Sequence, residues 1–115
     1  MPLLKLETTV PLNEEKQRSL LSALGKTLAG ATGKPEQYVM VTINQSAIAM
    51  SGEMGAAAFA DIRSIGGLSG EINRQLSQKI CRLLQDALGI EPARVYLNFT
   101  DIPAGHWGWD GDTFG

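Results

Sequence analysis

Hydrophobic and polar residues alternate at the start of the chain and then recur with the spacing of a helix. Residues 4–8 read Leu-Lys-Leu-Glu-Thr, an alternation that predicts a half-buried strand. Asn13 precedes two glutamates, which is typical of a helix N-terminus, and Gly33 followed by Pro35 is typical of a helix end. Between them one apolar stripe repeats every four positions, at Leu20, Leu24 and Leu28. The first part of the chain is therefore expected to form a strand and a long helix.

The same pattern returns at an offset of 56 residues. Residues 59–65 predict a second strand, Ser69 is placed to cap a second helix, and Gly89 is placed to end it. The stripe of this helix consists of Ile72, Leu76, Ile80, Leu84 and Leu88. A β-rich run follows each helix, at 38–43 and at 95–99. We interpret the two halves as duplicated strand–helix–strand units.

Two such units predict an α+β fold in which a four-stranded mixed sheet carries both helices on one face. Right-handed crossovers make the two strands within each unit parallel. We expect a single domain over 1–115, with repeat halves at about 2–46 and 57–102 and an aromatic, glycine-rich tail over 103–115 that forms a loop or a short hairpin. Residues 47–50 lie between the halves and are a candidate for a short edge strand.

The predicted sheet leaves one face without a helix. The covered face would carry Val39, Val41, Ile43, Val95, Leu97 and Phe99. The other face would carry Met40, Thr42, Tyr96, Asn98 and Thr100. A sheet with one uncovered, partly apolar face and two free edges favours self-association, so a dimer or a cyclic trimer is expected.

Composition narrows the functional classes. The 115 residues are 43% hydrophobic and 19% charged with a net charge of −2, which excludes a disordered chain and disfavours a nucleic-acid binder. One cysteine and one histidine exclude an internal disulfide and a cysteine- or histidine-rich metal site. No apolar run approaches a membrane span, and no signal peptide is visible. We expect a cytoplasmic protein without a metal. Secretion by a route that needs no signal peptide is an open alternative.

Pro2 is the leading candidate for chemistry. A small residue after Met1 favours removal of the initiator methionine, which would leave a secondary amine at the chain start. An α-amino group titrates at roughly 7.7–8.0, and burial or a nearby cation lowers that pKa. A base that is neutral near pH 7 suits proton abstraction. The alternative is that Pro2 lies at a frayed terminus. The predicted strand begins directly after Pro2, however, which favours a terminus anchored in the sheet.

Other residues have a functional and a structural interpretation. Lys34 is either a carboxylate-binding cation or a solvated lysine at a helix end, and Asn98 is either a polar group in a pocket or a satisfied amide. Aromatic side chains usually belong to a core, but those in the glycine-rich tail are harder to place there. These aromatic residues are Tyr38, Tyr96, Trp107, Trp109 and Phe114.

Several short motifs resemble the macrophage migration inhibitory factor family of the tautomerase superfamily, and the resemblance runs essentially from end to end. The matching pieces are Met1-Pro2, Thr8-x-Val10-Pro11, Ala31-Thr32-Gly33-Lys34-Pro35-x-Gln37-Tyr38, Ser64-Ile65-Gly66, Asn73-Arg74, Arg94-Val95-Tyr96-Leu97-Asn98 and Gly108-Trp109-x-x-x-Thr113-Phe114. The resemblance implies a homotrimer with active sites at subunit interfaces and a cofactor-independent keto–enol tautomerase for arylpyruvates such as phenylpyruvate. Isomerisation of dopachrome esters is the family's other assay reaction.

The resemblance also implies a role for each candidate residue. Pro2 would be the base, Lys34 and the backbone N–H of Ile65 would hold the keto acid, and Asn98 of a neighbouring subunit would complete the polar set. The aromatic wall would consist of Tyr38, Tyr96, Trp109 and Phe114. The expected partners are a small keto acid and two further copies of the chain, with no nucleic acid or membrane.

Three positions depart from the vertebrate members of that family. Residues 57–60 read Ala-Ala-Phe-Ala where those proteins carry Cys-x-x-Cys, which excludes thiol–disulfide activity by that motif. Leu12 replaces an arginine of a receptor motif, so receptor binding is not expected. Trp107 replaces a smaller residue and narrows the expected pocket mouth. The alternative function is a cytokine-like or host-directed binding protein with a vestigial pocket.

Overall fold

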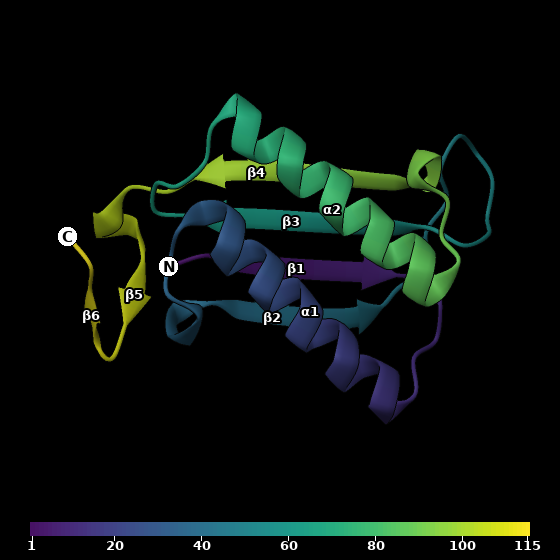
Figure 1. Cartoon of the computed structure of the whole chain (residues 1–115), viewed down its shortest axis with the longest axis horizontal. Helices are drawn as coiled ribbons and strands as arrows, with labels where there is room; N and C mark the ends of the chain where they lie inside the picture. Colours follow the sequence, from purple (N-terminus) through teal and green to yellow (C-terminus); the bar gives the residue numbers. More distant parts are fainter.

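A computed structural model describes all residues from 1 to 115 and contains one four-stranded sheet with two long helices on a single face (Figure 1). The strands are β1 (Leu3–Thr8), β2 (Met40–Gln45), β3 (Ala58–Ser64) and β4 (Val95–Asp101). Their order across the sheet is β2-β1-β3-β4. The pairs β1–β2 and β3–β4 are parallel and the central pair β1–β3 is antiparallel. The sequence-based prediction of a mixed sheet built from two parallel units is thus confirmed.

The helices α1 (Glu14–Thr32) and α2 (Gly70–Leu88) begin and end where their capping residues predict. The Asn13 side chain accepts a hydrogen bond from the N–H of Lys16, and Ser69 accepts one from Ile72. Gly33 and Gly89 close the two helices in the left-handed conformation, with φ of 72° and 66°. The two N-caps and the two end glycines are each 56 residues apart, so the repeat seen in the sequence is a repeat of local structure.

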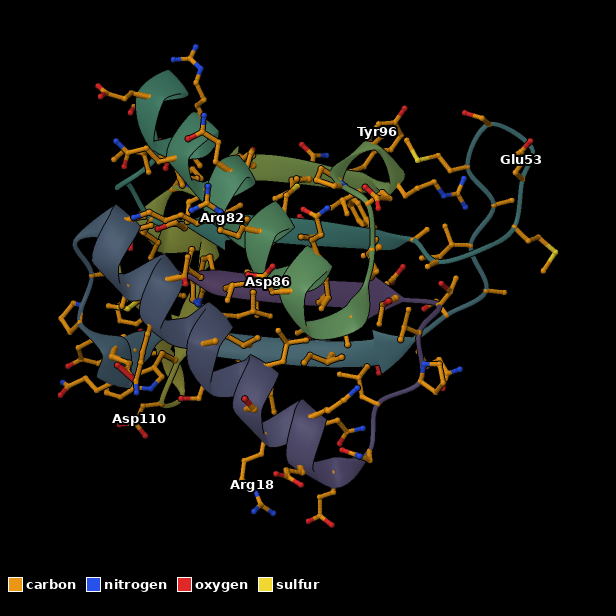
Figure 2. The ribbon with its side chains drawn as sticks, turned by 45° about the vertical axis from the view of Figure 1, so that its right-hand side comes forward. Arg18, Glu53, Arg82, Asp86, Tyr96 and Asp110 are labelled. Carbon is orange, nitrogen blue, oxygen red and sulfur yellow. The ribbon has the colours of Figure 1, made fainter.

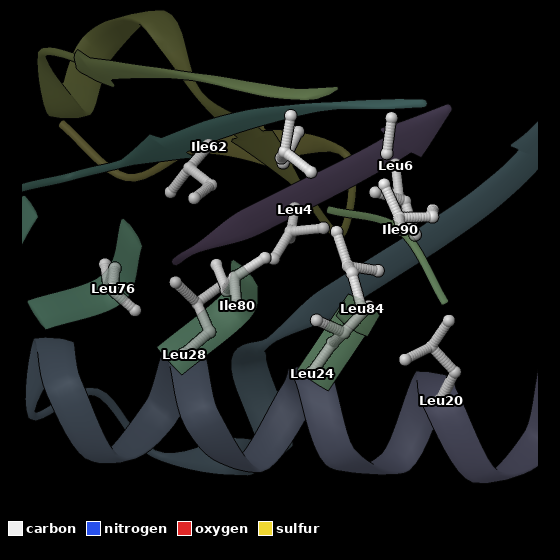
Figure 3. Packing of buried hydrophobic residues seen from close by; sticks show 13 residues of the cluster. Leu4, Leu6, Leu20, Leu24, Leu28, Ile62, Leu76, Ile80, Leu84 and Ile90 are labelled. Atoms are coloured by element: carbon white, nitrogen blue, oxygen red, sulfur yellow. The ribbon is translucent and has the colours of Figure 1, made fainter. Parts of the chain in front are cut away.

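The core lies between the helices and the covered face of the sheet (Figure 3). Leu4, Leu6 and Ile62 point from the strands toward Leu28 and Leu84 of the helices, and all five side chains are fully buried. Burial of one such side chain contributes about 1.5–3 kcal/mol. This layer fixes the sheet and the ends of its strands, which carry the candidate site. Neither helix is both long enough and apolar enough to cross a membrane.

Two local expectations were wrong. Tyr38 lies in a short 3-10 helix, η1 (Glu36–Tyr38), and β2 begins only at Met40. Pro35 explains this, because its fixed φ of −61° starts the extra turn before the chain reaches the sheet. Residues 47–50 form no strand; only an isolated bridge joins Met50 to Glu53. Equivalent 3-10 turns are η2 (Pro92–Arg94), before β4, and η3 (Ala104–His106), in the tail.

The tail forms a short hairpin, one of the two outcomes predicted for it. Its strands are β5 (Gly108–Trp109) and β6 (Asp112–Thr113), joined through Asp110 and Gly111 with φ of 53° and 79°. An Asp-Gly pair with two positive φ angles is the preferred two-residue hairpin turn. The Phe114 N–H donates to the Trp107 carbonyl at 3.1 Å and ties the hairpin together. Figure 1 shows the hairpin beside the N-terminus, beyond the end of the sheet.

The uncovered face of the sheet carries more charge than the sequence pattern suggested. Alternation along β1 and β3 places Lys5, Glu7, Asp61 and Arg63 on this face, opposite the buried Leu4 and Leu6. Arg63 and Asp61 form an ion pair at 3.0 Å. The free edges β2 and β4 are therefore a better reason for self-association than apolar burial on this face. Trimer formation remains a prediction.

Candidate active site

The candidate site forms at one end of the sheet, where the N-terminus meets η1 and the tail hairpin (Figure 1). A cavity of about 400 Å³ opens there. Its lining includes Met1, Pro2, Tyr38, Trp107, Trp109 and Phe114. Pro2 is fully buried, and its carbonyl accepts a hydrogen bond from the Met40 N–H at 3.1 Å. The terminus is therefore anchored in the sheet, which disagrees with the alternative of a frayed proline.

An aromatic wall closes this cavity on the side of the tail. The Tyr38 and Trp109 rings meet edge to face at 6.0 Å and 86°. Trp109 stacks on Phe114 at 5.8 Å and 11°. Both arrangements are favourable for aromatic pairs and contribute about 0.5–1.5 kcal/mol each beyond simple burial. Tyr38, Trp109 and Phe114 therefore form one rigid surface for a flat apolar group.

A polar corner lies next to the chain start. A Cβ placed on Gly66 would be 3.8 Å from Nζ of Lys34, so the ammonium lies over the turn that follows β3. The Ile65 N–H in this turn donates to no acceptor in the chain, whereas the Gly66 N–H donates to Asp101 Oδ1 at 3.0 Å. A free N–H beside an ammonium is a suitable arrangement for a carboxylate.

The glycines of this turn are required by the approach of α1. Gly66 and Gly67 have φ of 69° and 77°, a region that other residues rarely adopt. A Cβ on Gly67 would come within 2.9 Å of the Thr32 carbonyl oxygen at the end of α1. The structure shows that this Gly-Gly pair lets the end of α1, and with it Lys34, lie against the turn.

The amine at the chain start has a perturbed pKa. Burial, and to a smaller extent the Lys34 ammonium, lower the pKa of the Met1 amino group from its usual 8.0. In this chain Met1 carries the amine, and the Pro2 nitrogen is a tertiary amide without a proton. Met1 also lines the cavity. Its removal would leave a secondary amine on Pro2 in the wall of the cavity.

Tyr96 and Asn98 do not reach this site within one chain. Both lie on β4, the edge strand two positions away from β1. Leu3 pairs with Arg63, which pairs with Thr100, and Tyr96 lies four residues before Thr100 in β4. Standard strand geometry then separates Tyr96 from Leu3 by about 10 Å across the sheet and about 13 Å along it. Tyr96 is 66% exposed, and Figure 2 shows it near the loop of Glu53, away from Asp110 in the hairpin.

A larger groove of about 720 Å³ lies at the other end of β1. Its lining includes Val10, Gln45 and Met54. None of its lining residues is titratable, and it contains no aromatic ring. The smaller cavity around Pro2 combines an amine, an adjacent cation and four aromatic side chains. We therefore place the candidate active site there.

Comparison with known proteins agrees with this fold and site. The model of the family described as macrophage migration inhibitory factor matches residues 1–115. The macrophage migration inhibitory factor of Meriones unguiculatus is 40% identical over 115 residues, covering 99% of each chain. A homolog from Trichuris trichiura is also 40% identical, over 99% of this chain and 100% of the other. The crystal structure of a macrophage migration inhibitory factor-like protein from Entamoeba histolytica superposes with a TM-score of 0.94 at 34% identity, covering 98% of both chains.

The fold defines a class of small proteins built from two β-α-β repeats, and in this chain Pro2 lies in the wall of the candidate site. Within that class, the chain belongs to the macrophage migration inhibitory factor family.

Proposed function

We propose that this chain is a cofactor-independent keto–enol tautomerase that acts on arylpyruvates such as phenylpyruvate, with isomerisation of dopachrome esters as a second reaction. One observation carries the proposal. Pro2 is buried in the wall of an aromatic cavity, where burial and, to a smaller extent, the Lys34 ammonium lower the pKa of the amine at the chain start. Membership of the macrophage migration inhibitory factor family supports a tautomerase-like activity.

In the proposed mechanism, the substrate carboxylate binds the Lys34 ammonium and the free N–H of Ile65. The aryl ring lies against the wall of Tyr38, Trp109 and Phe114, whose rings are already packed together. This orientation places the carbon next to the ketone at the chain start. Because the aromatic wall excludes water on one side, the charge-assisted contacts to the carboxylate are stronger than they would be in solution.

The proton transfer needs Met1 to be absent. The neutral secondary amine of Pro2 takes a proton from the carbon next to the ketone, and the C–H electron pair forms the C=C bond of the enol. The ketone π electrons move to oxygen, which receives the proton that Pro2 releases. Burial, and to a smaller extent the Lys34 ammonium, lower the pKa of the amine at the chain start, and the same two causes would act on the Pro2 amine and favour its neutral form, which is the form that abstracts a proton.

We further propose that the protein works as a homotrimer in which a neighbouring subunit supplies Asn98 and Tyr96 to the site. Three features support this: the free edges β2 and β4, the exposure of Tyr96, and the distance between Tyr96 and Leu3 in one chain. Asn98 is exposed, and its Oδ1 accepts only from the Phe99 N–H. Its amide group is therefore free to donate to a ligand or a partner.

A subunit-mixing experiment tests the enzyme and the shared site together. Pro2→Gly and Asn98→Ala proteins, which we expect to be nearly inactive on phenylpyruvate when assayed alone, are unfolded together, refolded as mixed trimers and assayed. Mixed trimers contain interfaces in which an intact Pro2 meets an intact Asn98, so we expect activity to return to a measurable fraction of wild type. Failure of the mixture to exceed its parents would contradict a shared site. An inactive wild type with a free Pro2 would contradict the enzyme.

A further inference from the structure

A second, smaller cavity of about 250 Å³ adjoins the candidate active site. Both cavities are lined by Leu3, Trp107 and Gly108, so the same three residues form the partition between them. Beyond this partition, the second cavity is lined by Arg63, Ile102 and His106. It therefore places two nitrogen-bearing side chains next to a cavity whose own walls are mainly apolar and aromatic.

Arg63 has an unused hydrogen-bonding edge. It lies opposite Leu3 in the β1–β3 pairing, which places it one strand away from the chain start. Its Nε and one terminal nitrogen donate to the same oxygen of Asp61, at 3.3 and 3.0 Å. The other terminal nitrogen, Nη1, donates to no group in the chain. A guanidinium can bridge two carboxylates because its donors point along different edges.

His106 provides the second donor. Its backbone N–H donates to the Pro103 carbonyl at 2.9 Å, which fixes the short helix η3. The imidazole itself makes no hydrogen bond within the chain, and an imidazole has at least one N–H donor in either protonation state. No carboxylate lines this cavity, so its donors have no acceptor there.

We propose that the second cavity binds an anionic group on the aromatic ring of the substrate, and that the preferred substrates are therefore arylpyruvates with a ring carboxylate. This inference rests on the proposed tautomerase function and names the substrate class of that site. The 2-oxo acid end would lie at Lys34 and Ile65, and the ring would lie against Trp109. The ring carboxylate would pass the edge of Trp107 and accept from Arg63 and His106.

The test compares two substrate types on the same protein. Wild-type protein that starts at Pro2 is assayed with phenylpyruvate and with phenylpyruvates that carry a carboxylate at the meta or the para position. We expect at least one carboxylated isomer to have the higher kcat/KM. The ratio of the two kcat/KM values is the measured quantity, because a partly unfolded sample lowers both values equally.

Two variants should change this ratio in opposite directions. Arg63→Met should lower it by about tenfold or more, because a charge-assisted hydrogen bond is lost for one substrate only. Asp61→Asn should raise it by about two- to fivefold, because the carboxylate that competes for Arg63 is gone. A folding defect would not produce opposite shifts. Lys5→Met removes a cation opposite the same Asp61 without touching either cavity, and should leave the ratio within about twofold.

The outcomes separate this inference from the function on which it rests. Turnover of phenylpyruvate with no preference for either carboxylated isomer, or with equal ratios in wild type and Arg63→Met, would overturn the inference and leave the tautomerase intact. If no arylpyruvate is turned over, the proposed function fails. Equilibrium binding of the carboxylated compounds to wild type and Arg63→Met then decides the inference, and equal affinities would overturn it.

Discussion

A methyl group on Gly66 would lie 3.8 Å from Nζ of Lys34, so the ammonium at the end of α1 rests over the turn that ends β3. These two residues are 32 positions apart in the sequence. Their contact brings the cation of the first repeat to the free Ile65 N–H of the second repeat. The proposed carboxylate site is thus a product of the contact between the two halves of the fold.

Removal of the Lys34 ammonium should weaken substrate binding and leave the fold intact. Lys34→Ala is expected to lose about 1.5–3 kcal/mol of transition-state binding, or about ten- to a hundredfold in kcat/KM for phenylpyruvate. Steady-state kinetics and the melting temperature measure the two effects separately. Lys26→Ala, which removes an exposed cation from α1, is the matched control and should behave as wild type. Equal kinetics in the two variants would show that Lys34 is only a surface charge.

The same substitution should also shift the pH dependence. The Lys34 ammonium is the smaller of two causes that lower the pKa of the terminal amine. Without it the folded-state pKa rises, so a larger share of the base is protonated at any pH near that value. We expect the acidic limb of the kcat/KM profile to move to higher pH in Lys34→Ala and to stay in place in Lys26→Ala. A limb that does not move would mean that another group titrates.

Gly67 should tolerate no side chain. Its φ of 77° and the 2.9 Å approach of the Thr32 carbonyl oxygen both oppose a Cβ. Gly67→Ala is expected to cost about 1–3 kcal/mol in the free energy of unfolding and to displace Lys34, so activity should fall more than stability alone explains. Gly70→Ala, at the first residue of α2, is the control, since a Cβ there would meet nothing within 4 Å. Chemical denaturation of both variants gives the comparison.

Arg94 should control the order of the loop between β2 and β3. Its guanidinium donates to the carbonyls of Met50, Glu53 and Ala56 at 3.0, 3.1 and 3.3 Å. Arg94→Met removes all three bonds, so amide hydrogen exchange in residues 50–56 should accelerate while α1 and α2 keep their protection. Arg82→Met, an exposed arginine of α2 without an ion pair, should leave the loop unchanged (Figure 2). Unchanged exchange in Arg94→Met would mean that the loop is held by other contacts.

Much of the fold could be predicted because the same capping residues, end glycines and apolar stripes occur in both halves of the chain. Asn13 and Ser69 cap the helices, Gly33 and Gly89 end them, and the leucine stripes form the buried layer. The errors arose where one local signal competes with another. Tyr38 has high β-propensity, but Pro35 starts a 3-10 turn first. Residues 47–50 read as a strand, but the positive φ of Ser51 and Gly52 and the Arg94 contacts hold them in an irregular loop.

The site could be predicted only in part, because it joins distant segments. Pro2, Tyr38, Trp109 and Phe114 were candidates in the sequence and do line one cavity. The role of Gly67 could not be predicted, since the approach of Thr32 depends on how α1 packs. The second cavity was also missed, because Arg63 and His106 share no motif and meet only when the tail folds back over Leu3.

The central claim is that the amine of Pro2 is the base. It is tested most directly by preparing two samples of the same chain, one that keeps Met1 and one that starts at Pro2, with each terminus established by mass spectrometry. Both samples are then assayed with phenylpyruvate at the same trimer concentration. We predict that the Pro2-starting protein is active and that the Met1-retaining protein has lost nearly all activity, because its Pro2 nitrogen is an amide and is not basic. Equal rates for the two samples would contradict the account.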